Sequence, residues 1–172
     1  MKKEKITKKT FVYVLITDEY DNFYLLRDTN VTEVSIPRIQ RRFGQSLKEA
    51  RNDLLSQIFK KKGNDISSVT IPLPKSSHGN PLSENEQRPP AQKDIITIIN
   101  ENSFFEHYED TKGNVHLFYR CYIYQHEDIP LSISCHTIET IIDLEVIDND
   151  QKEVIVRAYI GLYSQQINPN LL

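Results

Sequence analysis

The sequence predicts an α+β domain in which a mixed β-sheet is sandwiched between helices. Three features support this fold class: two β-rich runs at the beginning, one amphipathic helix after them, and further strand-like runs that precede two helix candidates near the end. Strands and helices that do not alternate regularly are typical of the α+β class. At 172 residues, the chain has the length of one domain that buries a hydrophobic core without disulfides or metal.

The domain organisation follows from where apolar residues are scarce. Residues 1–9 are lysine-rich and are not followed by the apolar run of a secretory signal. We therefore expect a flexible basic tail over residues 1–9 and a single domain over residues 10–172. Residues 72–93 hold five of the eight prolines together with Ser, Asn and charged residues. Such a segment buries too little apolar surface to order itself, so we expect a mobile loop at 72–93, either an insertion without function or a lid.

Charge and composition exclude several function classes. The net charge of −3 gives no basic footprint, which argues against nucleic acid as a partner. No stretch approaches the roughly 20 apolar residues of a membrane helix, so no membrane association is expected. Cys121 and Cys135 lack the spacing of a zinc site and are too few for a disulfide framework. These observations together predict a cytoplasmic protein.

The N-terminal third predicts three strands. Residues 10–27 contain two β-rich runs that are separated by the polar segment 18–22, which predicts a hairpin. A further strand is expected through Ile36. Pro37 ends that strand, because proline lacks the N–H group that a sheet ladder requires.

A central amphipathic helix is the clearest element of the chain. Ser46 has the position of an N-cap, and Glu49 follows it at the spacing of a capping box. Apolar residues then recur with helical periodicity, which predicts one face packed on the sheet. These residues are Leu47, Ala50, Leu54, Leu55, Ile58 and Phe59. The lysines at 60–62 suit the negative end of the helix dipole, and Gly63 is expected to end the helix.

The C-terminal half predicts three more strands and two helices. The strands are expected at 94–99, 104–109 and 115–124, and the Gly-containing segment 110–114 is expected to join the last two as a hairpin turn. Apolar side chains on both faces of 115–124 are typical of a central strand. The helices are expected at 135–146 and 151–164.

Several of these segments also carry a family resemblance. The run FVYVLITDEYDNFYLLR at 11–27 is followed by Ile36-Pro37, by FGQSLKEA at 43–50 and by Gly63. In their order these segments resemble the Nudix superfamily, and the order of elements extends the resemblance over residues 10–164. The resemblance implies a Nudix-like, MutT-like fold. It also implies a loop and helix that gather glutamates around divalent metal to hydrolyse a diphosphate linkage.

The metal-binding motif departs from the family pattern. Arg38 follows Pro37 where the family has a glycine, and Gln45 replaces an acidic residue. In an ungapped alignment from Pro37, the family's Arg-Glu and Glu-Glu pairs become Asp53-Leu54 and Gln57-Ile58. Shifting the helix by one residue gives Asn52-Asp53 and Ser56-Gln57 instead. At best one carboxylate, Asp53, remains among the family's glutamate positions, so the resemblance implies a degenerate Nudix box.

The leading interpretation is a Nudix-like domain that lacks metal-dependent hydrolysis. It would bind a nucleotide or nucleoside-diphosphate-type ligand, or a protein partner, and no metal or other cofactor is expected. Arg38, Arg41, Arg42 and Gln57 are the ligand-binding candidates. Arginine makes bidentate contacts with phosphate, and Gln57 shares a helix face with Glu49 and Asp53 and can accept through its carbonyl.

An alternative interpretation is a divergent pyrophosphohydrolase that uses Mg²⁺ or Mn²⁺. Glu49 and Asp53 lie one turn apart on one helix face, so they would be the catalytic and metal-binding residues. Glu139 or Glu145 would add a carboxylate from elsewhere. The structural reading of the same pair is that Glu49 closes the capping box and that Asp53 is a solvated charge.

Weaker chemical signals lie outside this motif. The segment 41–46 reads R-x-x-G-x-S and faintly resembles the acyl-CoA phosphate loop of GNAT acetyltransferases, which would make the chain an acyl-CoA-dependent transferase. Cys135 next to His136 invites a Cys–His dyad, although such dyads are assembled in space and not by sequence neighbours. Proximity of His107 and His116 across the predicted hairpin is expected without a metal-binding pattern.

Overall fold

The structure is a computed structural model that describes residues 8–18, 20–27, 33–60, 66–69, 96–99, 104–123 and 129–164. The expected mobile loop at 72–93, residues 1–7 of the expected tail and Gly63 lie outside the described residues. Lys8 and Lys9 are bonded to the sheet, since the Lys8 ammonium pairs with Glu109 at 3.2 Å and the Lys9 amide donates to the Asn114 side chain. No helix among the described residues is long and apolar enough to cross a membrane.

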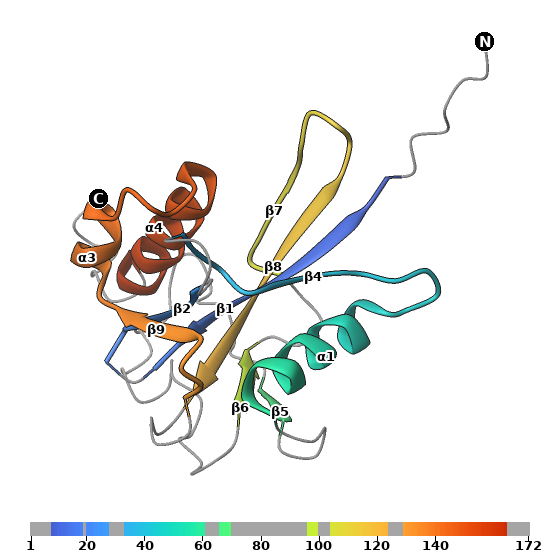
Figure 1. The fold of residues 1–172 in the computed structure, drawn as a ribbon, viewed down its shortest axis with the longest axis horizontal. Helices are drawn as coiled ribbons and strands as arrows, with labels where there is room; N and C mark the ends of the chain where they lie inside the picture. Colours follow the sequence, from blue (N-terminus) through green and yellow to red (C-terminus); the bar gives the residue numbers. More distant parts are fainter. Residues whose placement is uncertain are drawn as a thin grey trace, which may run out of the picture.

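Nine strands form one curled sheet in the described part of the chain (Figure 1). Their order is β3-β2-β1-β8-β6-β5, with β4 paired to β1, β7 to β8 and β9 to β2. The strands are β1 (Thr10–Thr17), β2 (Phe23–Arg27), β3 (Val34–Ser35), β4 (Arg38–Gln40), β5 (Ile66–Val69), β6 (Ile96–Ile99), β7 (Glu106–Glu109), β8 (Val115–Ile123) and β9 (Ile133–His136).

The centre of the sheet is a long parallel pair. β1 lies parallel to β8 in a register from Thr10 opposite Val115 to Thr17 opposite Tyr122. β2, β4, β6 and β7 pair antiparallel with these two strands, so the sheet is mixed, as predicted. The apolar side chains on both faces of β8 fit this central position, because both faces of the sheet are covered.

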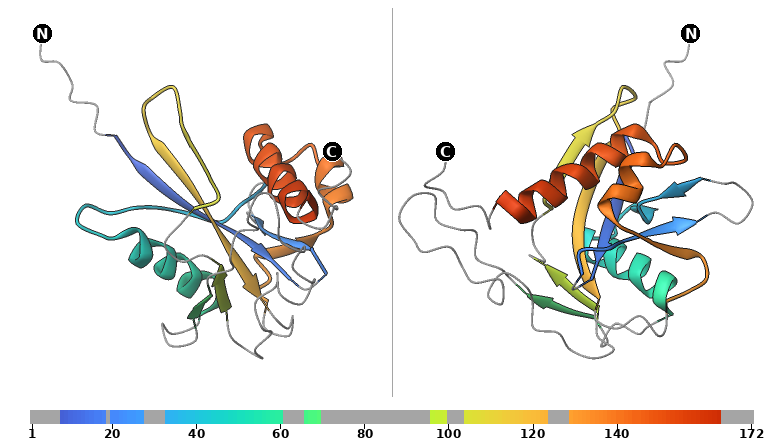
Figure 2. Two further views of the ribbon diagram at one scale, coloured as in Figure 1. Left: turned by 180° about the vertical axis from the view of Figure 1, so that it is seen from behind. Right: turned by 90° about the vertical axis from the view of Figure 1, so that its left-hand side faces the viewer.

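Helices cover the sheet on both faces (Figures 1 and 2). Alternate residues of β1 point to opposite faces. Val14 and Ile16 pack with Leu55 of α1 (Leu47–Phe59), whereas Tyr13 and Leu15 belong to the cluster of α3 (Ile138–Asp143) and α4 (Asn149–Ser164). The predicted α+β sandwich is therefore confirmed.

Four local predictions are corrected. Residues 38–40, which follow the strand end expected at Pro37, form β4. The Pro37 carbonyl accepts a 3.0 Å hydrogen bond from the Val14 amide, and the chain continues along β1. α1 ends at Phe59, where Lys60 takes a left-handed conformation with φ 52°. β9 occupies the start of the helix expected at 135–146, since 133–136 pair with β2. β5 was not predicted.

Candidate functional site

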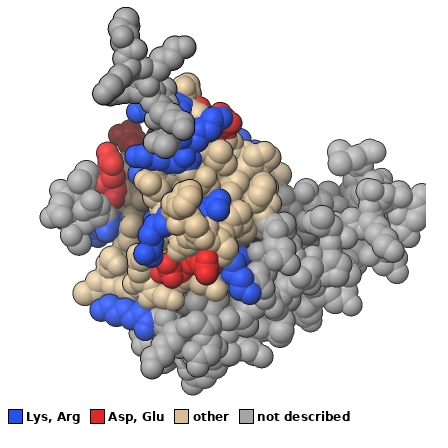
Figure 3. All heavy atoms as spheres, turned by 90° about the vertical axis from the view of Figure 1, so that its right-hand side faces the viewer, with Lys and Arg blue, Asp and Glu red and all other residues tan. Residues whose placement is uncertain are grey.

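An open pocket of about 390 Å³ lies where the β4–α1 loop meets the first turns of α1. Its lining residues are Arg42, Phe43, Gly44, Gln45, Glu49 and Asp53. Gly44 has φ +77°, a left-handed conformation that favours glycine and lets the loop turn into the helix. Figure 3 shows the face that carries this loop, where Lys and Arg side chains lie around a smaller group of acidic ones.

Glu49 is held by the backbone at the start of α1. The Ser46 amide donates to Glu49 Oε2 at 2.7 Å, and the Glu49 amide donates to Ser46 Oγ at 3.2 Å. This reciprocal pair is the predicted capping box. The hydrogen bond from the Ser46 amide lowers the pKa of the Glu49 carboxyl, because it stabilises the ionised form. Glu49 thus lines the pocket with one carboxylate oxygen already bonded.

Asp53 is the acceptor that closes the β4–α1 loop. Its Oδ2 atom accepts from Arg42 Nη2 at 2.9 Å and from Gln45 Nε2 at 2.7 Å. The side-chain oxygen of Gln45 accepts a hydrogen bond from the Arg42 backbone amide at 3.0 Å. The backbone carbonyl of Gln45 accepts from Arg41 Nε at 2.5 Å. A guanidinium therefore stands directly beside the one acidic side chain of the second turn of α1.

The neighbouring positions of α1 face the core. Leu54 and Ile58 are buried with Val14, Ile16 and Cys121 between the helix and the sheet. Arg51 is also buried, with 1% of its surface exposed, and its guanidinium lies 5.2 Å from the centre of the Tyr119 ring. The face of α1 that contacts the sheet is thus apolar except for one cation on an aromatic ring.

The structure brings together only some of the catalytic and ligand-binding candidates. Glu49, Asp53 and Arg42 meet in the pocket, and Arg41 supports the same loop. Arg38 and Gln57 do not line the pocket: Arg38 reaches Tyr13, and Gln57 is an exposed residue of α1.

The distant carboxylates do not complete the pocket. Glu139 lies in the first turn of α3 and Glu145 follows that helix, on the sheet face opposite α1 (Figure 1). No group of three or more His, Cys, Asp or Glu side chains that could hold a metal ion occurs among the described residues.

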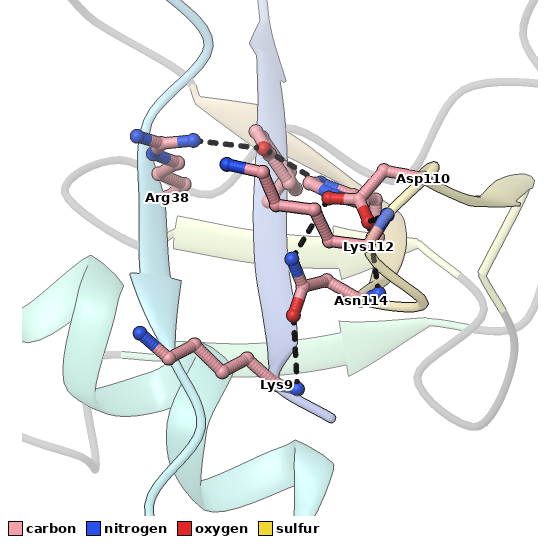
Figure 4. A network of polar contacts seen from close by, with 7 residues as sticks. Lys9, Arg38, Asp110, Lys112 and Asn114 are labelled. Atoms are coloured by element: carbon pink, nitrogen blue, oxygen red, sulfur yellow. Dashed lines mark hydrogen bonds and ion pairs between the residues drawn. The ribbon is translucent and has the colours of Figure 1, made fainter. Parts of the chain in front are cut away.

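A second polar cluster, which the sequence did not predict, lies at the other end of β4 (Figure 4). Arg38 Nη1 donates to the Tyr13 hydroxyl at 3.2 Å, that oxygen lies 3.0 Å from His116 Nδ1, and His116 Nε2 lies 3.1 Å from Asp110 Oδ2. Because a guanidinium only donates, the Tyr13 proton is available to Nδ1, and in that tautomer Nε2 donates to Asp110. Each group therefore donates a hydrogen bond to the next, from Arg38 through Tyr13 and His116 to Asp110.

The register of the β7–β8 hairpin explains why the sequence missed this cluster. Tyr108 lies opposite His116, whereas His107 lies opposite Leu117 and so points to the other face. The expected proximity of His107 and His116 is therefore wrong. The His116 ring stacks on Tyr108 at 4.5 Å and on Phe11 at 5.2 Å between ring centres.

The cysteines show no nucleophilic arrangement. Cys121 is fully buried, and burial raises the pKa of its thiol above the ordinary value. Burial also raises the pKa of Cys135, while His136 Nε2 lies 2.7 Å from Ser134 Oγ. Neighbouring strand residues point to opposite faces, so Cys135 and His136 do not form a dyad.

Several solved structures are similar in fold, although no model of a protein family and no curated protein matches the sequence. A hydrolase of the NUDIX family from Clostridium perfringens matches with a TM-score of 0.56 at 10% identity, over 91% of this chain and 97% of that one. The Ap4A hydrolase of C. elegans matches with 0.56 at 11% identity, over 90% and 98%. The MutT protein of Methanosarcina mazei Go1 matches with 0.55 at 16% identity, over 91% and 99%.

These likenesses concern the three-dimensional fold. At such low identity they show that the chain has a Nudix, MutT-like fold, as the sequence resemblance implied. The fold expected for a GNAT-like acyl-CoA transferase does not agree with these matches, because the matched structures have the Nudix fold.

Proposed function

We propose that this chain is a Nudix-fold binding module that holds a ligand of the nucleoside-diphosphate class without a metal ion and does not hydrolyse it. The observation that carries this proposal is the contact of Arg42 with Asp53, because it puts a side-chain cation beside the carboxylate that remains of the metal motif.

The side chains around the pocket do not fit a catalytic Mg²⁺ ion. Magnesium prefers near-octahedral oxygen coordination, with carboxylates as its protein ligands. Glu49 and Asp53 each have an oxygen bonded to protein donors. Leu54 and Ile58, which align with glutamates of the family motif, bring no oxygen and are buried. A divalent ion would have to compete with Arg42 for Asp53 and would find only the carboxylates of Glu49 and Asp53 in the pocket lining.

The same pocket suits an anionic organic ligand. Its volume of about 390 Å³ lies within the range of small-molecule sites. Arg42 uses one donor for Asp53, so the rest of its planar fork can contact a phosphate. The exposed Phe43 ring offers an apolar surface beside it. The name of one structural relative, Ap4A hydrolase, supports a nucleotide as the ligand class.

Isothermal titration with ADP-ribose, NAD and nucleoside diphosphates tests the proposal. We expect binding that is unchanged when EDTA is added and at least tenfold weaker in Arg42→Gln. Lys60→Gln is the matched control, since it removes one positive charge at the opposite end of α1. Absence of heat for every compound would reject the ligand and leave a protein partner as the role of the domain.

A divergent hydrolase is the second candidate, because Glu49 and Asp53 line one pocket. It predicts release of phosphate or nucleotide with Mg²⁺ or Mn²⁺, and a loss of at least a hundredfold in Asp53→Ala. No activity across a panel of nucleotides with either metal would reject this candidate. Activity that is lost in Asp53→Ala would instead overturn the metal-free proposal.

A further inference from the structure

Arg38 is an exposed cation whose direction is fixed by buried groups. Its guanidinium donates to the Tyr13 hydroxyl at 3.2 Å and lies 5.4 Å from the centre of the Phe11 ring. Tyr13 is 1% exposed, so the Arg38 head is anchored on a residue that cannot move freely. One of the five N–H donors of Arg38 is used in this contact, and the others are available for a ligand.

The anchor of Arg38 continues through three more residues. Tyr13 contacts His116, which contacts Asp110, and Asp110 Oδ2 also accepts from the Asn114 amide side chain at 2.9 Å. The Asn114 contacts lower the pKa of Asp110, with a further contribution from His116. Burying such polar groups is costly unless every one is paired. Here each side chain behind Arg38 is hydrogen-bonded to the next, and the series ends on the exposed guanidinium. Supporting residues arranged in this way hold a binding group in a fixed orientation.

Lys112 brings a second cation toward the same place. Asp110 Oδ1 accepts from the Lys112 and Asn114 amides at 2.9 Å each, and Gly113 completes the turn with φ +78°. Figure 4 shows the Lys112 side chain extending from this turn across the polar cluster toward Arg38.

The cations at this place have no ion-pair partner among the described residues, although one carboxylate, that of Asp110, lies in the same cluster. Within the described part of the chain, Arg38, Lys112 and the nearby Lys9 form no ion pair. The acidic residue beneath them, Asp110, is bonded to His116 and Asn114. Like charges that approach one another repel, and the repulsion is relieved when an anion lies between them.

We propose that Arg38 and Lys112 form a phosphate-binding site, separate from the α1 pocket, in which Tyr13, His116 and Asp110 position Arg38. The ligand class is a phosphate or pyrophosphate group. Arg38 contacts two of its oxygens through the planar fork, and Lys112 contacts a third as a point charge. The group is either free in solution or the terminal phosphate of a small molecule.

Titration of the full chain with inorganic pyrophosphate, followed by ¹⁵N NMR, tests this site. We expect saturable shifts of the Arg38 Nε–H and of the Lys112 and Gly113 amides, and at least tenfold weaker binding in Arg38→Gln and in Lys112→Gln. Lys60→Gln should bind as the wild type does. No saturable shift of these groups, or equal affinity in all variants, would overturn the site. A parallel titration with glucose 6-phosphate distinguishes the two sources: saturation at the same amides indicates an organic phosphate, and saturation by pyrophosphate alone indicates a free anion.

Two further variants separate positioning from folding and this site from the pocket. Tyr13→Phe keeps the ring but removes the hydroxyl, and it should weaken pyrophosphate binding severalfold while ADP-ribose binding stays unchanged. Arg42→Gln should leave pyrophosphate binding at this site intact, so failure of the α1 pocket and failure of this site are distinguishable. A folded Tyr13→Phe variant with wild-type pyrophosphate affinity would contradict the positioning role.

Discussion

Arg42 and Asp53 form an ion pair across the mouth of the α1 pocket, with Nη2 and Oδ2 2.9 Å apart. The pair joins a loop residue to the second turn of the helix, and Gln45 bonds to the same oxygen. In our proposal, the Arg42 guanidinium supplies the positive charge that a metal ion would supply in a Nudix hydrolase. The pair also makes a measurable thermodynamic prediction.

The coupling between Arg42 and Asp53 should be small and sensitive to salt. The Arg42 side chain is largely exposed and the Asp53 side chain is partly exposed, and exposed ion pairs contribute about 0.2–1 kcal/mol. A double-mutant cycle with Arg42→Ala and Asp53→Ala, measured by urea unfolding, should give a coupling in this range at low salt and less at about 1 M salt. A coupling of about 2 kcal/mol that persists in salt would contradict a screened surface pair.

Loss of the N-cap should weaken α1. Ser46→Ala removes the side-chain acceptor of the Glu49 amide, and such changes cost about 1 kcal/mol of unfolding free energy. Ser56→Ala, inside the same helix, serves as the control because alanine is the best helix former. Urea unfolding of both variants checks the prediction, and equal stability of Ser46→Ala and the wild type would refute it.

Leu54 should behave as a core residue and not as a surface position of a metal motif. Leu54→Ala should lower the unfolding free energy by about 2–5 kcal/mol, since it leaves a cavity between α1 and the sheet. Gln57→Ala, at an exposed position one turn later, should change it by no more than about 0.5 kcal/mol. Chemical denaturation gives both values. If the two variants lost the same small amount, Leu54 would have to be a solvent-facing residue.

Asp110 should make the fold sensitive to acid. Its pKa lies below the ordinary value in the folded chain because Asn114, His116 and the Lys112 amide bond to the ionised form. The stabilisation is therefore complete above the unfolded pKa of about 4 and is lost as the pH falls toward the folded pKa. The drop in Tm between neutral pH and about pH 3 should be smaller in Asp110→Asn than in the wild type. Asp143→Asn, an exposed substitution on α3, should keep the full drop.

Local patterns in the sequence predicted the elements that depend on neighbours along the chain. The β1–β2 hairpin, the capping box of α1 and the turn at 110–114 all arise from residues within a few positions of one another. β4 and β9 escaped prediction because each is short and becomes a strand only through pairing with β1 or β2. Their sequences carry little alternation of their own.

The candidate site was only partly predictable, because its contacts also join residues that are far apart in the sequence. The helix face that carries Glu49 and Asp53 follows from periodicity, but the partner of each carboxylate does not. Tyr13 and His116 are 103 residues apart, and their contact depends on the register between β1 and β8. A single sequence contains no signal for that register.

The parallel pairing of β1 with β8 has a consequence for how the chain is made. β1 can pair with β8, its longest partner, only after the residues from 115 onward have been synthesised. Until then one edge of an apolar strand stays open, and closing so long a segment is entropically slow. Nascent chains that stop before residue 115 should be bound by chaperones or degraded by proteases, because β1 then exposes an unpaired edge that β8 would otherwise cover.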